Sequence, residues 1–565
     1  MLRITRSDAP LLLLPVVALV AGLVWLLPGS DRDGDPRQEA TPTAAAERAA
    51  GRPNIVVVMT DDMRADDLRF MPSLRRLMNR QGVTFKNSFS PLPLCCPARA
   101  SFLTGVYPHN HGVWTVKAPH GYGAFDDSAT LGTSLKAAGY QTGFIGKYLN
   151  GYGQHRSRIS GEPSHRFVPP GWDDWRAALD NPGKPDLQGG TYSYYRTPFN
   201  VNGRVVTRHY GTYQTNVVGR MSRDMAGRFS DRAAPFFMVV NYVAPHHGGP
   251  REKDDPQPIV DARGKEWKFV TPARPRPVRG RFDDKVRHAA GMPRGGGPSE
   301  ADVSDKPRQW RKLPEPSKRE RLAMRELTRQ RGESLFLVDR QLQKTVRHLK
   351  RTGEWANTVF MFTSDNGYYQ GEHRQRQGKI TGHEPSLRVP FLVTGPGMRS
   401  GTDRYAPITT IDATASILEL AGAQPPVRSD GTSRAGLFTG GDTGWTVPVL
   451  HEVGSARRGG SGAFAGPHRV IGVRTARYAL LRYEGGDNEL YDLARDPAQN
   501  RNVWGSARYR DVRSDLVEVW SQLRDCAGDT CRASLPASLA TDTARTRELG
   551  RDYWREIKRR YGASG

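Results

Sequence analysis

Four short apolar segments, each followed at once by polar or charged side chains, restrict this chain to a small number of folds. The segments span residues 54–59, 141–145, 235–242 and 358–362. Amphipathic stretches lie between them, and this alternation is typical of an α/β domain. In open α/β sheets, ligands bind just outside the carboxyl ends of the strands. The groups that follow the four segments are therefore expected to converge on one pocket.

The polar groups at the four strand ends come from distant parts of the sequence. In chain order they are Asp61 and Asp62, then Lys147, then His246, and finally Asp365 and Asn366. A single aspartate or histidine after a strand is usually a turn former or a solvated loop residue. Four such ends in one domain indicate a functional site.

The chain is long enough for about two to four domains, with 565 residues. The α/β pattern covers residues 52–440 and is interrupted at 250–316 by a Pro-, Arg- and Gly-rich stretch, which predicts a long loop insertion. A helix is expected over 317–350, ending near Gly353. Short strand patterns then indicate a smaller C-terminal α+β subdomain over 441–535, followed by a tail.

The N-terminus carries the features of an export signal. Arg3 and Arg6 precede an apolar run over residues 10–27, and a polar stretch continues to residue 51. We expect residues 1–30 to form a signal peptide or a retained signal anchor, and residues 31–51 to form a disordered linker. The protein is thus expected to be exported, either secreted or anchored in a membrane and facing outside.

The four cysteines fall into two close pairs, and neither has the spacing of a zinc site. In an exported chain, Cys526 and Cys531 are expected to form a small disulfide loop. Cys95 and Cys96 need another explanation, because adjacent cysteines rarely bridge each other.

The net charge of +25 is large for a chain of this size. Such a surface attracts polyanions, whether nucleic acid, anionic lipid or sulfated glycan, and the charge alone does not choose among them. The alternative is that the arginine-rich composition only gives a solvated surface.

The segment around Cys95 predicts an anion site at the start of a helix. Pro97 suits the first helical position and Gly105 the stop, so Cys95 lies at the helix N-terminus, where unpaired N–H groups favour anions. Arg99 can reach back along the same face. A phosphatase with a C-x5-R loop is excluded, because Ser101 and Phe102 occupy the positions that would need arginine.

Cys95-x-Pro97-x-Arg99 followed by Leu103-Thr104-Gly105 resembles the sulfatase signature. Further motifs of that family follow in the same order: Asp61-Asp62, Gly146-Lys147, Pro245-His246, Ser364-Asp365-Asn366-Gly367, Gly378-Lys379, Glu384 and Arg388-Val389-Pro390. Residues 489–493 with Asp496-Pro497 resemble its C-terminal subdomain. The resemblance covers roughly residues 52–535 and implies an alkaline-phosphatase-like mixed central sheet flanked by helices.

The resemblance also implies a mechanism. Cys95 would be oxidised to Cα-formylglycine by a formylglycine-generating enzyme, and the hydrated aldehyde would attack sulfur and then release sulfate. Arg99 would hold the formylglycine in place, Lys147 and Lys379 would neutralise sulfate oxygens, and Lys379 or His246 would protonate the leaving alcohol. Ca²⁺, with Mg²⁺ as the alternative, would be held by Asp61, Asp62, Cys95, Asp365 and Asn366.

The sequence departs from the family pattern at one position. The family often has histidine two residues after the strand-end lysine, where this chain has Leu149. Other histidines near motif positions could contact substrate or could be structural or solvated: His109, His111, His247 and His373.

Two alternative functions remain open at this point. A phosphodiesterase or phosphonate monoester hydrolase of the same superfamily would use the same metal pocket. From another class, the chain could be an inactive, basic glycan-binding module, although the complete set of polar groups argues against a degenerate site.

The substrate follows from a narrower resemblance. The Cys95-Cys96-Pro97 variant, residues 107–111 and 146–150, and the pair Cys526 and Cys531 look like N-acetylglucosamine-6-sulfatases and their endo-acting relatives. This implies the 6-O-sulfate of N-acetylglucosamine in a sulfated glycan. A sulfated carbohydrate, rather than nucleic acid, is therefore the expected partner, and it would suit the basic surface.

Overall fold

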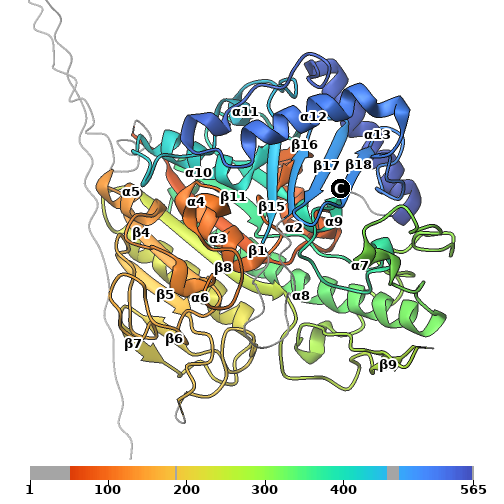
Figure 1. The fold of residues 1–565 in the computed structure, drawn as a ribbon. Coiled ribbons are helices and arrows are strands. Elements are labelled where there is room, and N and C mark those ends of the chain that lie inside the picture. Colours follow the sequence, from red (N-terminus) through yellow and green to blue (C-terminus); the bar gives the residue numbers. More distant parts are fainter. Residues whose placement is uncertain (1–50, 185–186, 262, 455–469, 563–565) are drawn as a thin grey trace, which may run out of the picture. The chain divides into compact units, whose positions relative to one another are not determined.

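The four apolar segments form neighbouring strands at the centre of one sheet (Figure 1). The computed structural model describes residues 51–184, 187–261, 263–454 and 470–562. The central strands are β11 (Thr358–Ser364), β1 (Asn54–Asp61), β8 (Phe236–Pro245) and β4 (Gln141–Lys147), in that order and all parallel. Their carboxyl ends therefore meet at one edge of the sheet.

Outer strands extend the sheet on both sides and make it mixed. Counting the described residues, it has ten strands in the order β13-β2-β12-β11-β1-β8-β4-β5-β6-β7. Strand β12 pairs antiparallel with β11, and β6 pairs antiparallel with β5. The outer strands are β2 (Gly82–Phe85), β5 (Asp174–Ala178), β6 (Phe199–Val201), β7 (Arg204–Val206), β12 (Phe391–Thr394) and β13 (Thr402–Arg404).

Helices cover both faces of this sheet. Every residue of β1 is therefore buried. Ile55, Val57 and Met59 belong to a core shared with α3 (Cys95–Thr104), α5 (Leu131–Ala137) and α10 (Thr410–Ala421). Val56 and Val58 alternate with them and belong to a second core, shared with α2 (Pro72–Gln81), α6 (Gln214–Ser230) and α8 (Lys318–Arg351). The predicted α/β fold, a mixed sheet flanked by helices, is confirmed.

Local signals set the ends of the long helix α8. The Ser317 side chain accepts a hydrogen bond from the backbone N–H of Glu320, and the Glu320 carboxylate accepts one from the backbone N–H of Ser317. At the other end, Gly353 has φ 78°, a left-handed conformation that favours glycine. The helix predicted over 317–350 therefore forms with nearly the expected bounds.

The insertion expected at 250–316 is irregular but firmly attached to α8. It contains the strands β9 (Ile259–Val260) and β10 (Glu266–Trp267), which pair with each other. The short helix α7 (Arg308–Arg311) lies near its end, just before α8. Arg274 is fully buried and forms ion pairs with Glu333 of α8 at 2.7 Å and with Glu252 at 2.7 Å. A buried charge is stable only when it is paired in this way.

A smaller C-terminal sheet follows the α/β part. The described residues give it four antiparallel strands: β15 (Val449–Val453), β16 (Val470–Arg474), β17 (Tyr478–Tyr483) and β18 (Asn488–Asp492). Helix α12 (Arg510–Leu523) covers one face, where Leu480 and Leu490 join Leu516 and Val519 in a core. The other face carries Leu481 and Tyr491 in a separate apolar cluster.

Residues 536–565, expected as a tail, contain the helix α13 (Thr543–Tyr561). Tyr553 of this helix is buried, and the Arg388 guanidinium lies 4.3 Å from the centre of its ring. Trp554 donates from Nε1 to the carbonyl of Lys86 at 3.2 Å. Contacts with residues far away in the sequence thus hold this helix.

The remaining short α-helices are α4 (Pro108–His111), α9 (Glu384–Leu387) and α11 (Gly436–Thr439). The short strands β3 (Ser88–Phe89) and β14 (Ile408–Thr409) pair with each other.

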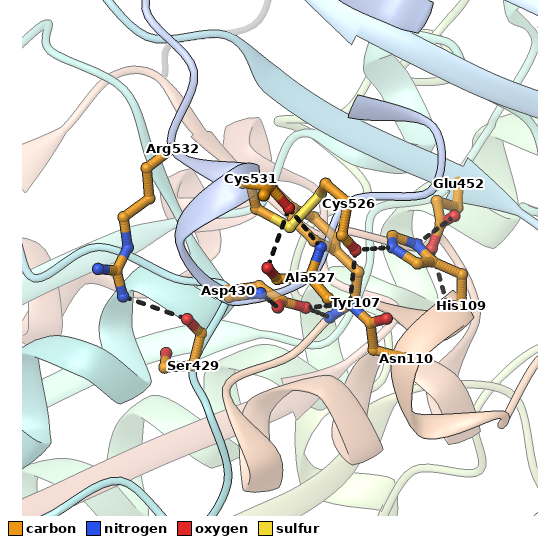
Figure 2. Close-up of a disulfide and its surroundings, with 12 residues drawn as sticks. Tyr107, His109, Asn110, Ser429, Asp430, Glu452, Cys526, Ala527, Cys531 and Arg532 are labelled. Carbon is orange, nitrogen blue, oxygen red and sulfur yellow. Dashed lines mark hydrogen bonds and ion pairs between the residues drawn. A yellow bond between two sulfur atoms is a disulfide. The ribbon is translucent and has the colours of Figure 1, made fainter. Parts of the chain in front are cut away.

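The predicted disulfide between Cys526 and Cys531 is present (Figure 2). The carbonyl of Cys526 accepts hydrogen bonds from Asn110 Nδ2 at 2.9 Å and from His109 Nε2 at 2.6 Å. His109 Nδ1 contacts the Glu452 carboxylate of β15 at 2.9 Å. The disulfide loop therefore holds α4, the short helix that follows α3.

Replacing both Cys526 and Cys531 with serine is expected to lower the free energy of unfolding by about 2 kcal/mol, the size predicted for a short closed loop. The turnover number of the folded protein should stay unchanged, because the loop contacts α4 and not the strand ends. Urea unfolding of the variant and of reduced wild type measures the first effect. A turnover number that falls in both samples would contradict a purely stabilising role of the disulfide.

The signal expected at residues 1–30 and all but the last residue of the linker expected at 31–51 lie outside the described residues. In the part of the chain that the structure describes, none of the helices combines the length and the apolar character needed to cross a membrane.

Candidate functional site

The carboxyl ends of the four central strands bring the predicted polar groups together. Asp61 is the last residue of β1, Lys147 is the last residue of β4, and His246 directly follows β8. Asp62 follows Asp61, while Asp365 and Asn366 directly follow β11. The backbone N–H of Asp62 donates to Asp365 Oδ1 at 3.1 Å, so the ends of β1 and β11 are in contact.

Helix α3 presents Cys95 and Arg99 to the same place. The helix begins at Cys95, two residues earlier than expected, so Pro97 is its third residue, and it ends before Gly105 at φ 76°. Arg99 lies one turn after Cys95. Its Nε pairs with Asp365 Oδ2 at 2.8 Å and its Nη1 donates to the carbonyl of Lys147 at 3.1 Å. Arg99 therefore links α3 to the ends of β11 and β4.

Two lysines neutralise the aspartates at the carboxyl end of β1. Lys147 Nζ lies 2.5 Å from Asp61 Oδ2. Lys379 comes from the loop between β11 and α9, and its Nζ donates to Asp62 Oδ1 and lies 2.8 Å from Cys95 Sγ. Lys379 is thus the residue that connects the cysteine to the carboxylates.

The oxygen atoms of this group have unused capacity for a cation. Asp61 Oδ1, Asp62 Oδ2 and Asn366 Oδ1 are buried and accept no hydrogen bond from the described residues. Ligand atoms of Asp61, Asp62, Cys95 and His246 all lie within 4.8 Å of one another. Buried oxygens without donors are costly, and carboxylate and amide oxygens are the ligands that Ca²⁺ and Mg²⁺ prefer. The donor set therefore fits a hard divalent cation.

The surroundings shift the pKa values of Asp62 and Cys95 in opposite directions. Burial raises the pKa of Asp62, but the Lys379 ammonium, which also hydrogen-bonds this carboxylate, outweighs burial and brings the pKa to about 2. Burial and the nearby Asp61 carboxylate raise the pKa of the Cys95 thiol to about 12. At neutral pH the site therefore contains an ionised carboxylate and a protonated thiol, and a protonated thiol is a poor nucleophile.

His246 is held as a neutral ring. Burial, together with the neighbouring His247, lowers its pKa well below the ordinary range. Nδ1 lies 2.7 Å from the carbonyl of His247, which can only accept, so Nδ1 carries the hydrogen. Nε2 therefore presents a lone pair to Asp62 Oδ2, 3.7 Å away.

Three residues that sequence reasoning did not identify support the site. Arg331, fully buried in α8, donates to the backbone carbonyl of Asp62, which has φ 69°. Such a conformation persists only when the surroundings hold it. Asn241 Nδ2 donates to the carbonyl of Lys147 at 2.8 Å. The Tyr192 ring centre lies 4.4 Å from the His246 ring centre and 5.0 Å from Lys147 Nζ.

The histidines near motif positions have different surroundings. His109 and His111 hold α4: His111 Nε2 contacts Ser101 Oγ at 2.9 Å. His373 is buried and contacts Glu300 at 2.8 Å. His247 is exposed, and its ring stacks on that of His246 with centres 4.1 Å apart. Of the four, His247 is the one beside the cluster.

Glu384 and Arg388, which belong to the family motifs, lie outside the cluster of strand-end groups. Glu384 pairs with Arg388 at 2.6 Å and with Arg474 of β16 at 2.8 Å. All three side chains are buried. They connect α9 to the C-terminal sheet.

The chain matches known protein families and individual proteins. The family model described as Sulfatase matches residues 53–423, and the model described as N-sulphoglucosamine sulphohydrolase, C-terminal, matches residues 371–526. An arylsulfatase of Volvox carteri is 30% identical over 531 residues, covering 86% of this chain and 77% of that protein. The N-acetylglucosamine-6-sulfatase of Homo sapiens is 28% identical over 534 residues, covering 86% and 87%. An extracellular sulfatase SULF-1 homolog of Drosophila melanogaster is 28% identical, covering 68% of this chain and 31% of that protein.

Solved structures share the fold at lower identity. One, a protein in complex with its substrate D-glucosamine-2-N,6-O-disulfate, superposes with a TM-score of 0.62 at 21% identity, covering 83% of this chain and 97% of that chain. A phosphonate monoester hydrolase from Silicibacter pomeroyi superposes with a TM-score of 0.59 at 20% identity, covering 87% and 100%. The Sulfatase family model matches more than half of the sequence. This chain therefore belongs to the sulfatase family, the enzymes that hydrolyse sulfate esters.

Proposed function

We propose that this enzyme cleaves the 6-O-sulfate of N-acetylglucosamine in sulfated glycans, with formylglycine at position 95 and Ca²⁺ as cofactor. The observation that carries the proposal is the position of Cys95. Its sulfur lies 2.8 Å from Lys379 Nζ and beside Asp61 and Asp62, at the first residue of α3. The helix N-terminus and the lysines favour a bound sulfate group at this place.

The raised pKa of Cys95 argues against the unmodified thiol as the nucleophile. An unmodified thiol that titrates at about 12 would be protonated at neutral pH. Conversion to formylglycine by a formylglycine-generating enzyme would supply a hydrated aldehyde, whose hydroxyl is the nucleophile toward sulfur. Because conversion removes the sulfur, Lys379 would then face the new oxygen atoms.

The cation site would use Asp61, Asp62, Asp365 and Asn366, with position 95 as a further ligand. Asp365 already accepts from Arg99 and from two backbone N–H groups, but a carboxylate has room for further partners. When bound, Ca²⁺, with Mg²⁺ as the alternative, would supply Lewis-acid polarisation of the sulfate ester.

The remaining side chains would bind the sulfate group and move a proton. Arg99 holds Asp365 and the end of β4 in place. Lys147 and Lys379 would neutralise the sulfate oxygens as charge grows on them. We assign protonation of the leaving alcohol to Lys379 rather than to His246, because the free Nε2 of neutral His246 carries no proton to donate.

A sulfated glycan as substrate is supported by the relatives named N-acetylglucosamine-6-sulfatase and by the net charge of +25. A basic surface accelerates encounter with a polyanion, and salt screens this effect. Export is supported by the N-terminal sequence pattern and by the disulfide, which persists in oxidising compartments. We therefore place the enzyme outside the cell, either secreted or anchored facing outward.

The substrate assignment predicts a clear preference in a panel of sulfated sugars. The 6-O-sulfate of N-acetylglucosamine should be hydrolysed with the highest kcat/KM, ahead of 2-O- and N-sulfated sugars, with aryl sulfates as slower surrogates. Released sulfate is measured for each compound. Preference for another position would contradict the proposed substrate only, whereas preference for a phosphonate monoester or phosphodiester over every sulfate ester would contradict the proposed reaction.

A further inference from the structure

The residue after Lys379 has an unusual backbone conformation. Ile380 has φ 74°, in the left-handed region. This conformation is unfavourable for any residue with a side chain and most of all for a β-branched one. It persists only where surrounding contacts hold the backbone, and such positions cluster at functional sites. The contacts of Ile380 therefore bear on the direction of Lys379.

The side chain of Ile380 packs into the C-terminal sheet. It lies against the buried cluster on the face of that sheet opposite α12, formed by Val453, Val470, Ala479, Leu481, Tyr491 and Leu493. The loop approaches this face closely. A Cβ atom added to Gly382 would lie only 2.4 Å from Leu481 Cδ2.

Polar contacts fix the loop on both sides of Lys379. Before it, the backbone N–H of Tyr369 donates to the carbonyl of Gly378 at 2.7 Å. After it, the Tyr369 hydroxyl hydrogen-bonds Thr381 Oγ1 and lies 3.1 Å from His383 Nδ1. The other ring nitrogen of His383 lies 3.3 Å from the Glu489 carboxylate of β18. Tyr369, His383 and Glu489 are fully buried, so these contacts are shielded from water.

We propose that Ile380 is a positioning residue: it anchors the Lys379 loop in the C-terminal sheet and so aims the Lys379 ammonium at Cys95 and Asp62. The C-terminal sheet then influences catalysis through the Lys379 loop. The inference rests on the proposed role of Lys379, and it makes the contribution of Ile380 depend entirely on that lysine.

A double-mutant cycle tests this dependence. Ile380→Ala should lower kcat for a sugar sulfate by about 10²-fold, the scale on which small misplacement of a catalytic group acts, with a smaller change in KM. Ile380→Val, which keeps most of the anchor, should restore most of kcat. In a chain that already carries Lys379→Ala, adding Ile380→Ala should cause little further loss.

The leaving group provides a second measurement that a purely structural role would not change. An alkyl alcohol needs protonation more than a phenol does, so Lys379→Ala and Ile380→Ala should both reduce hydrolysis of a sugar sulfate more than hydrolysis of an aryl sulfate. Leu480→Ala is the matched control. Leu480 is a fully buried residue of β17 on the opposite face of the same sheet, toward α12, so its truncation should lower stability while keeping kcat within about twofold of wild type.

Three results would overturn the inference. The first is a multiplicative effect of the two substitutions, and the second is a kcat for Ile380→Ala equal to that of Leu480→Ala. In either case, a large loss with Lys379→Ala alone would leave the proposed function standing. The third is full activity of Lys379→Ala, which would remove the proposed role of the lysine together with the inference.

Discussion

Replacement of Cys95 by alanine is expected to abolish hydrolysis of sulfate esters, with a loss of roughly 10⁴-fold or more, the scale of nucleophile removal in hydrolases. Cys96→Ala should keep most of the activity. The two sulfurs differ in surroundings: Cys95 Sγ lies 2.8 Å from Lys379 Nζ, whereas Cys96 Sγ lies 3.7 Å from the carbonyl of Asn150. The cluster of ligand atoms includes Cys95 and not Cys96.

Peptide mass and activity should be measured on the same preparations. The wild-type peptide and the Cys96→Ala peptide should both show the mass loss of thiol-to-aldehyde conversion at position 95, and Cys95→Ala should show none at either position. Circular dichroism checks that each variant is folded. An active Cys95→Ala enzyme beside an inactive Cys96→Ala enzyme would reverse the assignment.

Loss of a metal ligand should have the second largest effect. Asp61→Asn or Asp365→Asn is expected to weaken binding of Ca²⁺ and to reduce kcat by about 10²-fold or more, because the Lewis-acid contribution of a bound cation amounts to several kcal/mol. Both side chains are buried, and each pairs with a cation of the site, Lys147 or Arg99. Each substitution therefore removes charge at the cluster with little change in volume.

Calcium titration of the chelated enzyme, followed by activity, measures this prediction. Asp174→Asn is a suitable control, because Asp174 is also a buried carboxylate of the main sheet, paired with Arg176 at 2.9 Å, but lies in β5 away from the strand-end cluster. It should not change the calcium requirement. Full activity of wild type in a metal-free preparation would exclude the proposed cofactor.

The sequence alone was sufficient to predict the central sheet and most of the polar cluster at its strand ends. Apolar segments long enough to cross a sheet must be buried, and in an α/β fold the polar residues that end them meet at one edge. Asp61, Lys147, His246 and Asp365 were therefore predictable as neighbours from local patterns. The first and last residues of α3 and α8 were predictable to within about two residues, because the residues that cap a helix are local in the sequence.

The tertiary structure alone decided which of these groups touch and what holds them. Arg331 and Tyr192 reach the site from a helix and a long loop, while Ile380 packs against the C-terminal sheet next to Lys379. No periodicity in the sequence marks any of the three. Helix α13, which lies in the segment predicted as a tail, is held by Arg388, 165 residues before Tyr553 in the chain. Contacts of this kind depend on packing between distant segments, and packing has no local signature in the sequence.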